Sequence, residues 1–589
     1  MIAILTDRPN VGKEIARIVG AHRFEKGYMT GNGYAVTWTF GNMLSLAMPK
    51  DYGNAKLERK DFPLVPGDFR LMVKHVRTDE GWIPDISAVM QLKTVEKVLA
   101  ECDTIIAATE ASREGEMTFR YLYRYLGCRQ PVQRLWLSSL TDEAIRKGMT
   151  NLLPIRMFDR MFLASDSRNK ADWILGINAS YAMCKATGLG NNSLGRVQTP
   201  VLAAISRRYR ERENHISSDS WPIYISLQKD GILFKMRRTQ DLPDKESATM
   251  FFQDCKLAHQ AQITGISHSV KEILPPDLLD LTQLQKEANI RYGFTASEVY
   301  DIAQSLYEKK LISYPRTSCR YLTEDVFDSL PPIMARLLSW ELFPAAKGTG
   351  GIDISSLSRH VISAEKANVH HAIIITGIRP GNMSEKEMQV YRLVAGRILE
   401  AFMAPCRIET TNVEAVCAAQ HFKAEQTRII EAGWHDVFMR SDMIPTSGYS
   451  VKELPEVEKG DTLNVCGCNL VHKKQLPVNP FTDAELVEYM EQNGLGTVSS
   501  RTNIIRTLVN RKYIRYSGKY IVPTPKGMFT YETIRGKKIA DTSLTADWEK
   551  QLAGLESGMI TGQDFLNRIR TLAKEMTDDI FNTYSTKEE

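Results

Sequence analysis

The first 140 residues alternate between apolar runs and amphipathic stretches. Apolar runs predict strands at Met1–Asp7, Tyr34–Phe40, Thr104–Ala108 and Val132–Leu137. Helical spacing of apolar residues predicts intervening helices at Pro9–Gly20, Ala88–Cys102 and Glu114–Leu126. This alternation predicts a mostly parallel sheet with helices on both faces, whose ligands lie beyond the carboxyl ends of the strands. Two of these strands end at acidic residues, Asp7 and Glu110.

The pattern changes in the rest of the chain. Residues 141–210 have helical periodicity, whereas residues 215–275 and 405–475 contain alternating, β-prone stretches. We expect one β domain that the chain enters, leaves and re-enters. A shift of 202 residues aligns seven identical residues between Thr295 and Tyr314 with seven between Thr497 and Tyr516, although chance could produce such a match. Both segments are predicted to form two helices and then a strand with a tyrosine, which is the outline of a winged-helix unit.

Composition narrows the possible functions. A length of 589 residues suggests about four domains. The 75 basic and 70 acidic residues give a net charge of +5, which neither establishes nor excludes nucleic-acid binding. We find no apolar run long enough to span a membrane. The nine cysteines lack the paired spacing of a zinc site, so we expect free thiols in a reducing cytoplasm and no zinc.

One segment partly matches a nucleotide-binding motif but lacks two of its required residues. Val11-Gly12-Lys13 resembles the end of a phosphate-binding P-loop. Asp7 occupies the place of the required first glycine, and Glu14 that of the Ser or Thr. We therefore expect no ATP-driven chemistry.

An acidic cluster follows the strand at Thr104–Ala108. Glu110, Ser112 and Glu114 recur at alternate positions, and oxygen ligands at this spacing could converge on Mg²⁺. The alternative is a solvated turn whose acids favour a helix N-terminus.

A second cluster suits phosphoryl chemistry. Tyr314 could attack phosphorus, and Arg316, two residues on, could bind phosphate oxygens with both arms of its guanidinium. The alternative is a packed tyrosine at a strand end. His370 could donate to a phosphate or be a structural histidine.

Two further segments could contact DNA. The loop Ser193–Thr199 offers donors to phosphates and base edges, or else simply precedes a helix. Residues 501–520 interleave basic and aromatic side chains, which suits single-stranded nucleic acid but is also compatible with a solvated basic face.

Taken together, these segments resemble the type IA DNA topoisomerases, most closely the topoisomerase III branch. Residues 281–316, which end in SYPRT, look like the active-tyrosine segment. Further motifs follow the order of the family: ADWILGIN at 171–178, SLGRVQTP at 193–200, HHAII at 370–374, GLGT at 494–497 and LTADWE at 544–549.

The resemblance implies a multidomain fold of α/β and α+β parts that enclose a toroidal hole. Its domains would be a toprim domain (1–140), a helical and winged-helix DNA-binding domain (141–212 and 477–589), a β-rich arch (213–277 and 403–476) and a winged-helix-like (CAP-like) domain with the active tyrosine (278–402).

The resemblance also implies an activity. The enzyme would cleave one DNA strand through a 5′-phosphotyrosine bond without ATP, pass another strand and religate, thereby relaxing negative supercoils or decatenating. The substrate would be single-stranded or underwound DNA. A cytoplasmic, nucleoid-associated monomer is expected, with a helicase or single-strand-binding protein as an open candidate partner. The alternative is a DNA-binding accessory protein of the same fold with weak or lost cleavage.

Roles follow from matching positions in the family. The catalytic set is Tyr314, Arg316, Asp7, Arg8 and His370. The metal set is Asp7, Glu110, Ser112 and Glu114. The DNA-binding set is Arg113, Arg168, Asp172, Ser193, Leu194, Gly195, Arg196, Val197, Gln198, Thr199, Thr497 and Arg501. Ser112 stands where the family has a second aspartate, so weak Mg²⁺ binding is expected.

Overall fold

The computed structural model describes most of the chain. It covers residues 1–53, 57–78, 81–137, 140–188, 192–340, 342–343, 357–363, 365–367, 370–439 and 445–585. Within these ranges, no helix is long and apolar enough to cross a membrane.

The N-terminal region folds around a seven-stranded sheet in the order β11-β10-β9-β1-β4-β3-β2. The strands are β1 (Ile2–Thr6), β2 (Arg23–Glu25), β3 (Tyr28–Gly31), β4 (Tyr34–Trp38), β9 (Thr104–Ala107), β10 (Val132–Arg134) and β11 (Leu153–Pro154). Only the four central strands are parallel, and the edge strands β11, β3 and β2 pair antiparallel. The sheet is therefore mixed, which corrects the expectation of a mostly parallel sheet.

Helices cover both faces of this sheet. Ile4 of β1 packs with Val11 and Ile15 of α1 (Pro9–Val19). The next residue, Leu5, faces the other way and packs in the core formed with α2 (Ile86–Ala100) and α3 (Arg113–Tyr125). This alternation is the period of two of a strand, so the predicted elements and two-sided burial are both observed.

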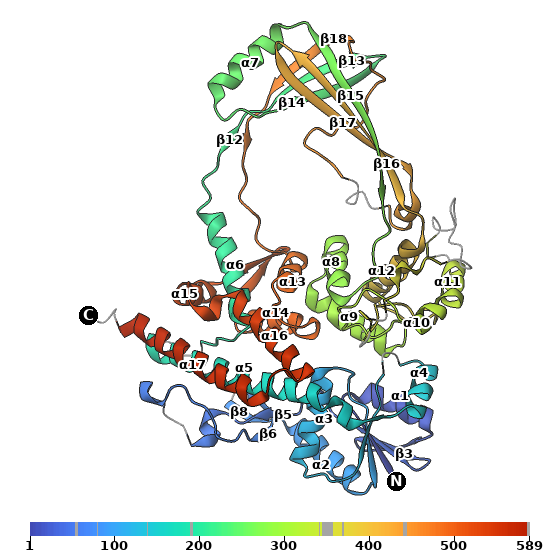
Figure 1. Cartoon of the computed structure of the whole chain (residues 1–589), viewed down its shortest axis with the longest axis vertical. Coiled ribbons are helices and arrows are strands. Elements are labelled where there is room, and N and C mark those ends of the chain that lie inside the picture. The colour runs from blue at the N-terminus through green and yellow to red at the C-terminus, as the bar shows by residue number, and fades with distance from the viewer. Residues whose placement is uncertain are drawn as a thin grey trace.

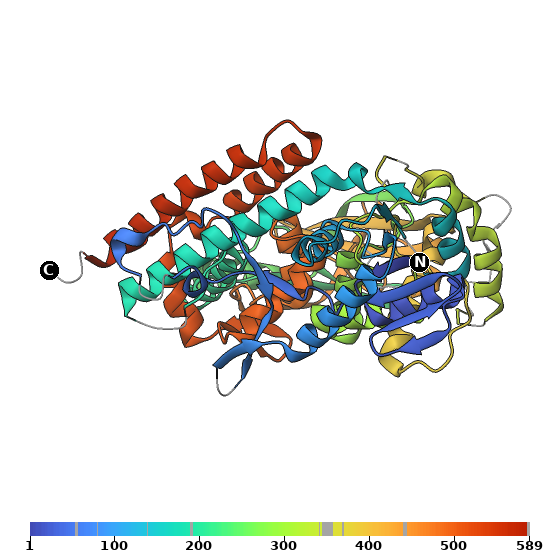
Figure 2. The ribbon, with the colours of Figure 1, turned by 90° about the horizontal axis from the view of Figure 1, so that it is seen from below.

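A long helical layer lies beside the sheet. Helix α5 (Asp159–Thr187) packs against α16 (Thr542–Ser557) and α17 (Gly562–Ser585), so segments far apart in the chain share one core. Figure 2 shows α5 and α17 side by side along much of their length. An insertion after β4 packs on the same layer and contains the small pairs β5 (Leu44–Leu46) with β6 (Leu71–Val73) and β7 (His75–Thr78) with β8 (Gly81–Pro84).

The two β-prone stretches form one closed barrel, in the order β13-β14-β17-β16-β15-β18. Its strands are β13 (Ile223–Lys229), β14 (Ile232–Arg238), β15 (Gln260–Ile273), β16 (Cys406–Cys417), β17 (Gln420–Glu431) and β18 (Thr462–Leu470). Three strands precede the tyrosine segment and three follow it, so the chain does leave and re-enter this unit. Figure 1 shows the barrel at the end of the molecule opposite the seven-stranded sheet, joined to the remainder by two legs of chain.

The helical elements outside the sheet and barrel complete the architecture. They are α4 (Asp142–Thr150), α6 (Gln198–Glu213), α7 (Lys245–Leu257), α8 (Leu281–Tyr292), α9 (Ala296–Glu308), α10 (Glu324–Asp328), α11 (Leu330–Ser339), α12 (Glu385–Phe402), α13 (Asp483–Gln492), α14 (Val498–Asn510) and α15 (Pro525–Ile534).

The repeat is visible in the backbone. Thr295 and Thr497 are the N-caps of α9 and α14, which have 13 residues each. Both helices are followed by a lysine at positive φ, Lys310 at 62° and Lys512 at 60°. The second copy continues into the hairpin of β20 (Ile514–Ser517) and β21 (Tyr520–Pro523). In the first copy the expected strand is wrong, because Ile312 makes only an isolated bridge to Ile375 and Tyr314 lies in an irregular loop.

The two copies pack against each other. Arg501 donates to Thr282 at 2.9 Å and pairs with Glu491 at 3.1 Å, and Lys286 pairs with Glu488 at 2.7 Å. Asp483, at the start of α13, accepts hydrogen bonds from the backbone N–H of Ala296 and the hydroxyl of Tyr516.

Asp483→Asn is expected to stabilise the protein more at pH 7.5 than at pH 4.5. Burial raises the pKa of Asp483 to about 6, from 3.8. Because the folded pKa lies above the unfolded one, ionisation of the buried carboxyl group lowers the free energy of unfolding as the pH rises from about 4 to 6. The total loss is on the order of 2–3 kcal/mol. Asparagine can still accept both hydrogen bonds. Urea unfolding of both forms at the two pH values measures the difference, and a gain independent of pH would contradict the assignment.

Candidate active site

The site lies where two parallel strands end. Strands β1 and β9 are neighbours, so the residues that follow them, Asp7 and Glu110, meet at the carboxyl edge of the sheet. The Glu110 backbone N–H donates to Asp7 Oδ1 at 3.2 Å. Burial and the nearby Glu110 carboxylate raise the pKa of Asp7 to about 6. The expectation from the strand pattern is confirmed in this respect.

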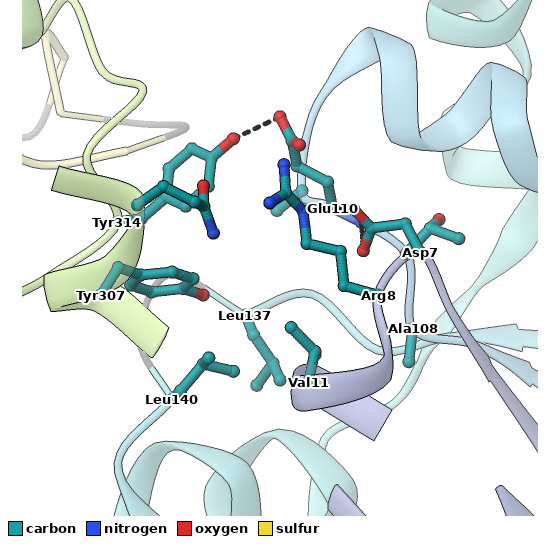
Figure 3. A pocket seen from close by; sticks show the side chains of 12 residues that line it. Asp7, Arg8, Val11, Ala108, Glu110, Leu137, Leu140, Tyr307 and Tyr314 are labelled. Atoms are coloured by element: carbon teal, nitrogen blue, oxygen red, sulfur yellow. Dashed lines mark hydrogen bonds and ion pairs between the residues drawn. The ribbon is translucent and has the colours of Figure 1, made fainter. Parts of the chain in front are cut away.

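Tyr314 reaches this edge from the opposite domain. Its side chain is 6% exposed, and its hydroxyl donates to one oxygen of Glu110 (Figure 3). Arg316 Nη1 binds the other oxygen of Glu110 at 2.6 Å. Burial, reinforced by the Glu110 charge, raises the pKa of Tyr314, so the phenol is a protonated donor in this arrangement. One carboxylate thus holds both the phenol and the guanidinium.

A polar network extends this contact across the domain boundary. Arg8 pairs with Glu308 at 3.3 Å, and Asn10 donates to the same carboxylate at 2.9 Å. Gln304 bridges from Glu308 to Arg316, with distances of 2.9 and 3.1 Å. No sequence signal points to Glu308, Asn10 or Gln304, because each lies on an ordinary helical surface and makes these contacts only through the packing of the two domains.

His370 also spans the boundary. Its Nε2–H donates to the backbone carbonyl of Ala111 at 2.6 Å, and its ring lies 4.6 Å from that of Tyr314. Burial lowers the pKa of His370, which favours the neutral imidazole. Nδ1 is buried without a hydrogen-bond partner among the described residues, so it is the atom left to meet a substrate group.

The proposed metal ligands are only partly brought together. Asp7, Glu110 and Glu114 line one cavity of ≈ 370 Å³, together with Arg8 and Arg316. Among the described residues, however, no three His, Cys, Asp or Glu side chains are grouped closely enough to hold an ion. Both Glu110 oxygens are already engaged. The donor chemistry suits Mg²⁺, but the closed arrangement does not form a ready coordination site.

Ser112 has a different local role from the one its motif position implies. It is the N-cap of α3, where its Oγ accepts a hydrogen bond from the N–H of Gly115 at 3.1 Å. This satisfies an otherwise unpaired donor of the first helical turn. Ser112 is absent from the lining of the carboxylate cavity. The solvated-turn alternative therefore describes Ser112 better than metal ligation does.

The expected DNA-binding residues fall into three groups. The first is a row of charged side chains between α3, α5 and α16. Arg168 pairs with Glu114 at 3.3 Å, and Arg113 donates to Glu556 at 2.8 Å. Arg196 is 2% exposed and pairs with Asp172 at 3.0 Å and Glu549 at 3.2 Å. Glu556 was not expected from the sequence, whereas Glu549 ends the LTADWE motif.

The second group lies in the loop Ser193–Thr199, which is held by hydrogen bonds within the loop and to the surrounding protein. Gly195 N–H donates to Thr199 Oγ1, Leu194 N–H to Ser180 Oγ, and Gln198 Nε2 to the Ser193 carbonyl. Leu194 and Thr199 are 3% and 1% exposed, and Val197 packs at the edge of a core. Ser193 and Gln198 also accept from Arg511. The side chains of Leu194 and Thr199 thus pack within the protein, and the DNA contacts expected of this loop stay a prediction.

Thr497 and Arg501 lie at the boundary between the repeated units. Thr497 caps α14, and Arg501 is 8% exposed in its contacts with Thr282 and Glu491. Arg501 is therefore held in the contact between these units, whereas Thr497 is half-buried and its hydroxyl donates to Ser500 Oγ at 3.1 Å.

Comparison with known proteins agrees with this geometry. A family model described as DNA topoisomerase matches residues 156–567. The chain is 30% identical to DNA topoisomerase 3 of Bacillus licheniformis, over 98% of this chain and 81% of the relative. It is also 30% identical to DNA topoisomerase 3 of Bacillus subtilis, over 99% and 82%. The structure of full-length topoisomerase I from Thermotoga maritima has the same fold, with a TM-score of 0.73 at 22% identity over 98% of this chain and 90% of that one.

These matches cover the barrel, the repeated helical units and the tyrosine segment together, which defines the class as a DNA topoisomerase. The chain belongs to the type IA DNA topoisomerases, in the topoisomerase III branch.

Proposed function

We propose that the protein cleaves one DNA strand with Tyr314, holds the 5′ end as a phosphotyrosine, passes another strand through the break and religates it. The observation that carries this proposal is the shared contact of Tyr314 and Arg316 with Glu110. Attack by the phenolic oxygen forms the P–O bond to Tyr314 and breaks the bond to the 3′ oxygen, which leaves as a hydroxyl. One phosphodiester replaces another, so no ATP is required.

Each side chain of the site has a part in this step. Glu110 accepts the phenolic hydrogen bond and is placed to take that proton. Arg316, whose Nη1 now binds Glu110 and whose Nη2 binds Gln304, has the planar fork that can bind two phosphate oxygens. Arg8 adds a second cation, and His370, whose ring lies 4.6 Å from that of Tyr314, has Nδ1 without a hydrogen-bond partner among the described residues. The protein would thereby relax negative supercoils or resolve linked DNA.

The architecture supports single-stranded or underwound DNA as the substrate. The network of Arg8, Glu308 and Arg316 and the contacts of Arg501 both tie the tyrosine unit to its neighbours. We propose that their release opens a path into a toroidal hole beneath the barrel, within the four-domain division expected from the sequence. Arg113, Arg168 and Arg196 would then exchange carboxylate partners for phosphates. Action as a nucleoid-associated monomer in the cytoplasm, with a helicase or single-strand-binding partner, belongs to this same proposal.

Mg²⁺ is retained as the proposed cofactor. When bound, it would neutralise phosphate charge. Asp7, Glu110 and Glu114 are the side chains that would hold it, after Glu110 has been released from Tyr314 and Arg316. Because Ser112 contributes no carboxylate, weak binding is expected.

The proposal is tested with a labelled single-stranded oligonucleotide incubated without ATP and quenched with denaturant. A protein–DNA adduct that maps to the peptide containing Tyr314, with a free 3′ hydroxyl on the released fragment, is the expected result. DNA binding with no adduct under any Mg²⁺ concentration would instead favour the accessory-protein alternative.

Ser112→Asp is expected to lower the Mg²⁺ concentration needed for half-maximal relaxation of plasmid DNA, by roughly threefold to tenfold. Aspartate is as good an N-cap as serine, so α3 should be preserved while one negative charge is added near the carboxylate cavity. Ser112→Asn is the matched control, since it also caps a helix but adds no charge. Equal midpoints for the aspartate and asparagine forms would mean that position 112 does not sense the ion.

A further inference from the structure

A second pocket lies away from the candidate active site. It occupies ≈ 410 Å³ between the insertion strands β5 and β6 and the helices α3 and α5. These four elements are labelled in the lower part of Figure 1. This volume is within the range of pockets that bind small ligands. None of the catalytic or metal-site residues lines it.

The inner wall of this pocket is apolar and rigid. Leu46 is 6% exposed and belongs to the core of the helical layer. Phe69 packs edge-on against Trp173, with ring centroids 5.4 Å apart. Tyr121 is 2% exposed, and its hydroxyl is fixed by Asp166 at 2.9 Å. The wall is therefore preformed for an apolar side chain.

Cations surround this apolar wall. Lys170 is neutralised by Asp166 at 2.7 Å, which uses the second oxygen of that carboxylate. Arg70 and Arg124 have no carboxylate within ion-pair distance in the part of the chain that the structure describes. Instead, the Arg124 guanidinium lies 4.5 Å from the Phe162 ring, and Arg70 lies 4.7 Å from the Tyr52 ring. Two positive charges thus remain without an anionic partner at the rim.

The position of the pocket separates it from the charged row near the active site. Arg168 and Asp172 of α5 face Glu114 and Arg196. Asp166 and Lys170 precede Arg168 and Asp172, respectively, by two residues. Two residues correspond to a rotation of about 200° around the helix axis. The pocket and the row therefore lie on opposite faces of α5.

We propose that this pocket is a docking site for an acidic peptide segment of a partner protein that also carries a bulky apolar residue. The apolar residue would enter against Leu46 and Phe69, and carboxylates beside it would pair with Arg70 and Arg124. Charge complementarity favours this occupant, because the rim has a surplus of positive charge. Nucleic acid fits less well, because Tyr121 is buried and Phe69 packs edge-on against Trp173, which leaves Tyr125, 42% exposed, as the largely exposed ring of the lining, whereas successive bases stack on several such rings.

The test uses a fluorescent, aspartate-rich synthetic peptide that ends in phenylalanine, with anisotropy as the readout on the full chain. Arg124→Glu and Arg70→Glu are each expected to weaken binding about tenfold. Arg129→Glu is the matched control, because Arg129 is an exposed arginine just beyond α3 that does not line the pocket. Replacing the terminal phenylalanine of the peptide by alanine should also weaken binding, whereas plasmid relaxation should be unaffected by all three protein variants.

Two results would overturn the proposal. One is undetectable peptide binding, or binding that Arg124→Glu leaves unchanged. The other is a parallel loss of oligothymidylate binding in Arg124→Glu and Arg70→Glu but not in Arg129→Glu, which would make the pocket a nucleic-acid site. Because the readout is peptide binding, its failure is distinguishable from failure of Tyr314 to form an adduct.

Discussion

Tyr314→Phe is expected to abolish both the covalent DNA adduct and plasmid relaxation, with a loss on the order of 10⁴-fold or more, as for removal of other catalytic nucleophiles. The substitution removes only the phenolic oxygen. The ring can keep its edge-on contact with Tyr307, at 5.5 Å between centroids, and its tilted contact with His370. The fold should therefore persist, with a stability change of about 1 kcal/mol from the lost hydrogen bond. Adduct trapping and relaxation assays measure the two losses.

Tyr307→Phe is the matched control for this experiment. Tyr307 lines the same pocket as Tyr314 and is also 6% exposed (Figure 3). Its conversion to phenylalanine should leave adduct formation within about threefold of the wild type, since its hydroxyl is not the attacking group in the proposed step. An adduct that survives in Tyr314→Phe, or one that disappears in Tyr307→Phe, would refute the assignment of the nucleophile.

The sequence predicted local elements well because their signals are local. The strands that end near Asp7 and Glu110 follow from apolar runs, and their adjacency follows from the rule for parallel sheets. The hydrogen bond between Glu110 and Tyr314 joins residues 204 positions apart, so no periodicity in the chain encodes it. Only the resemblance to a known family suggested that these residues meet.

A motif names a contiguous segment, but it does not tell which way each side chain points. The side chains of SLGRVQTP at 193–200 have different surroundings. Leu194 and Thr199 point into the protein, while Gln198 and Arg196 engage polar partners. Ser112 shows the same effect, because its motif position suggests metal ligation whereas its hydroxyl caps α3. Sequence position identified the region, but burial and hydrogen bonding decide the role of each residue.

Arg316→Ala is expected to reduce the rate of DNA cleavage by about 10²- to 10³-fold, which is the usual effect of removing one preorganised donor to a reacting oxyanion. Arg316 is positioned by Gln304 at 3.1 Å and lies 5.0 Å from the Tyr300 ring, so it is held in place before substrate arrives. Arg316→Lys should recover part of the rate. Lysine restores the charge but not the planar fork that binds two phosphate oxygens at once. Single-turnover cleavage of an oligonucleotide measures these rates.

DNA affinity separates a catalytic effect of Arg316 from a binding effect. In a Tyr314→Phe background, where cleavage is absent, Arg316→Ala should change the affinity for single-stranded DNA by no more than about threefold. This follows because Arg316 would contact one phosphate in the proposed step, whereas affinity for DNA is distributed over many phosphates. If Arg316→Ala weakened DNA affinity by the same factor as it slowed cleavage, Arg316 would act in DNA binding rather than in catalysis. An unchanged cleavage rate in Arg316→Ala would mean that Arg316 does not bind the scissile phosphate. Arg8, which pairs with Glu308 at 3.3 Å, would then be the remaining cation of the site.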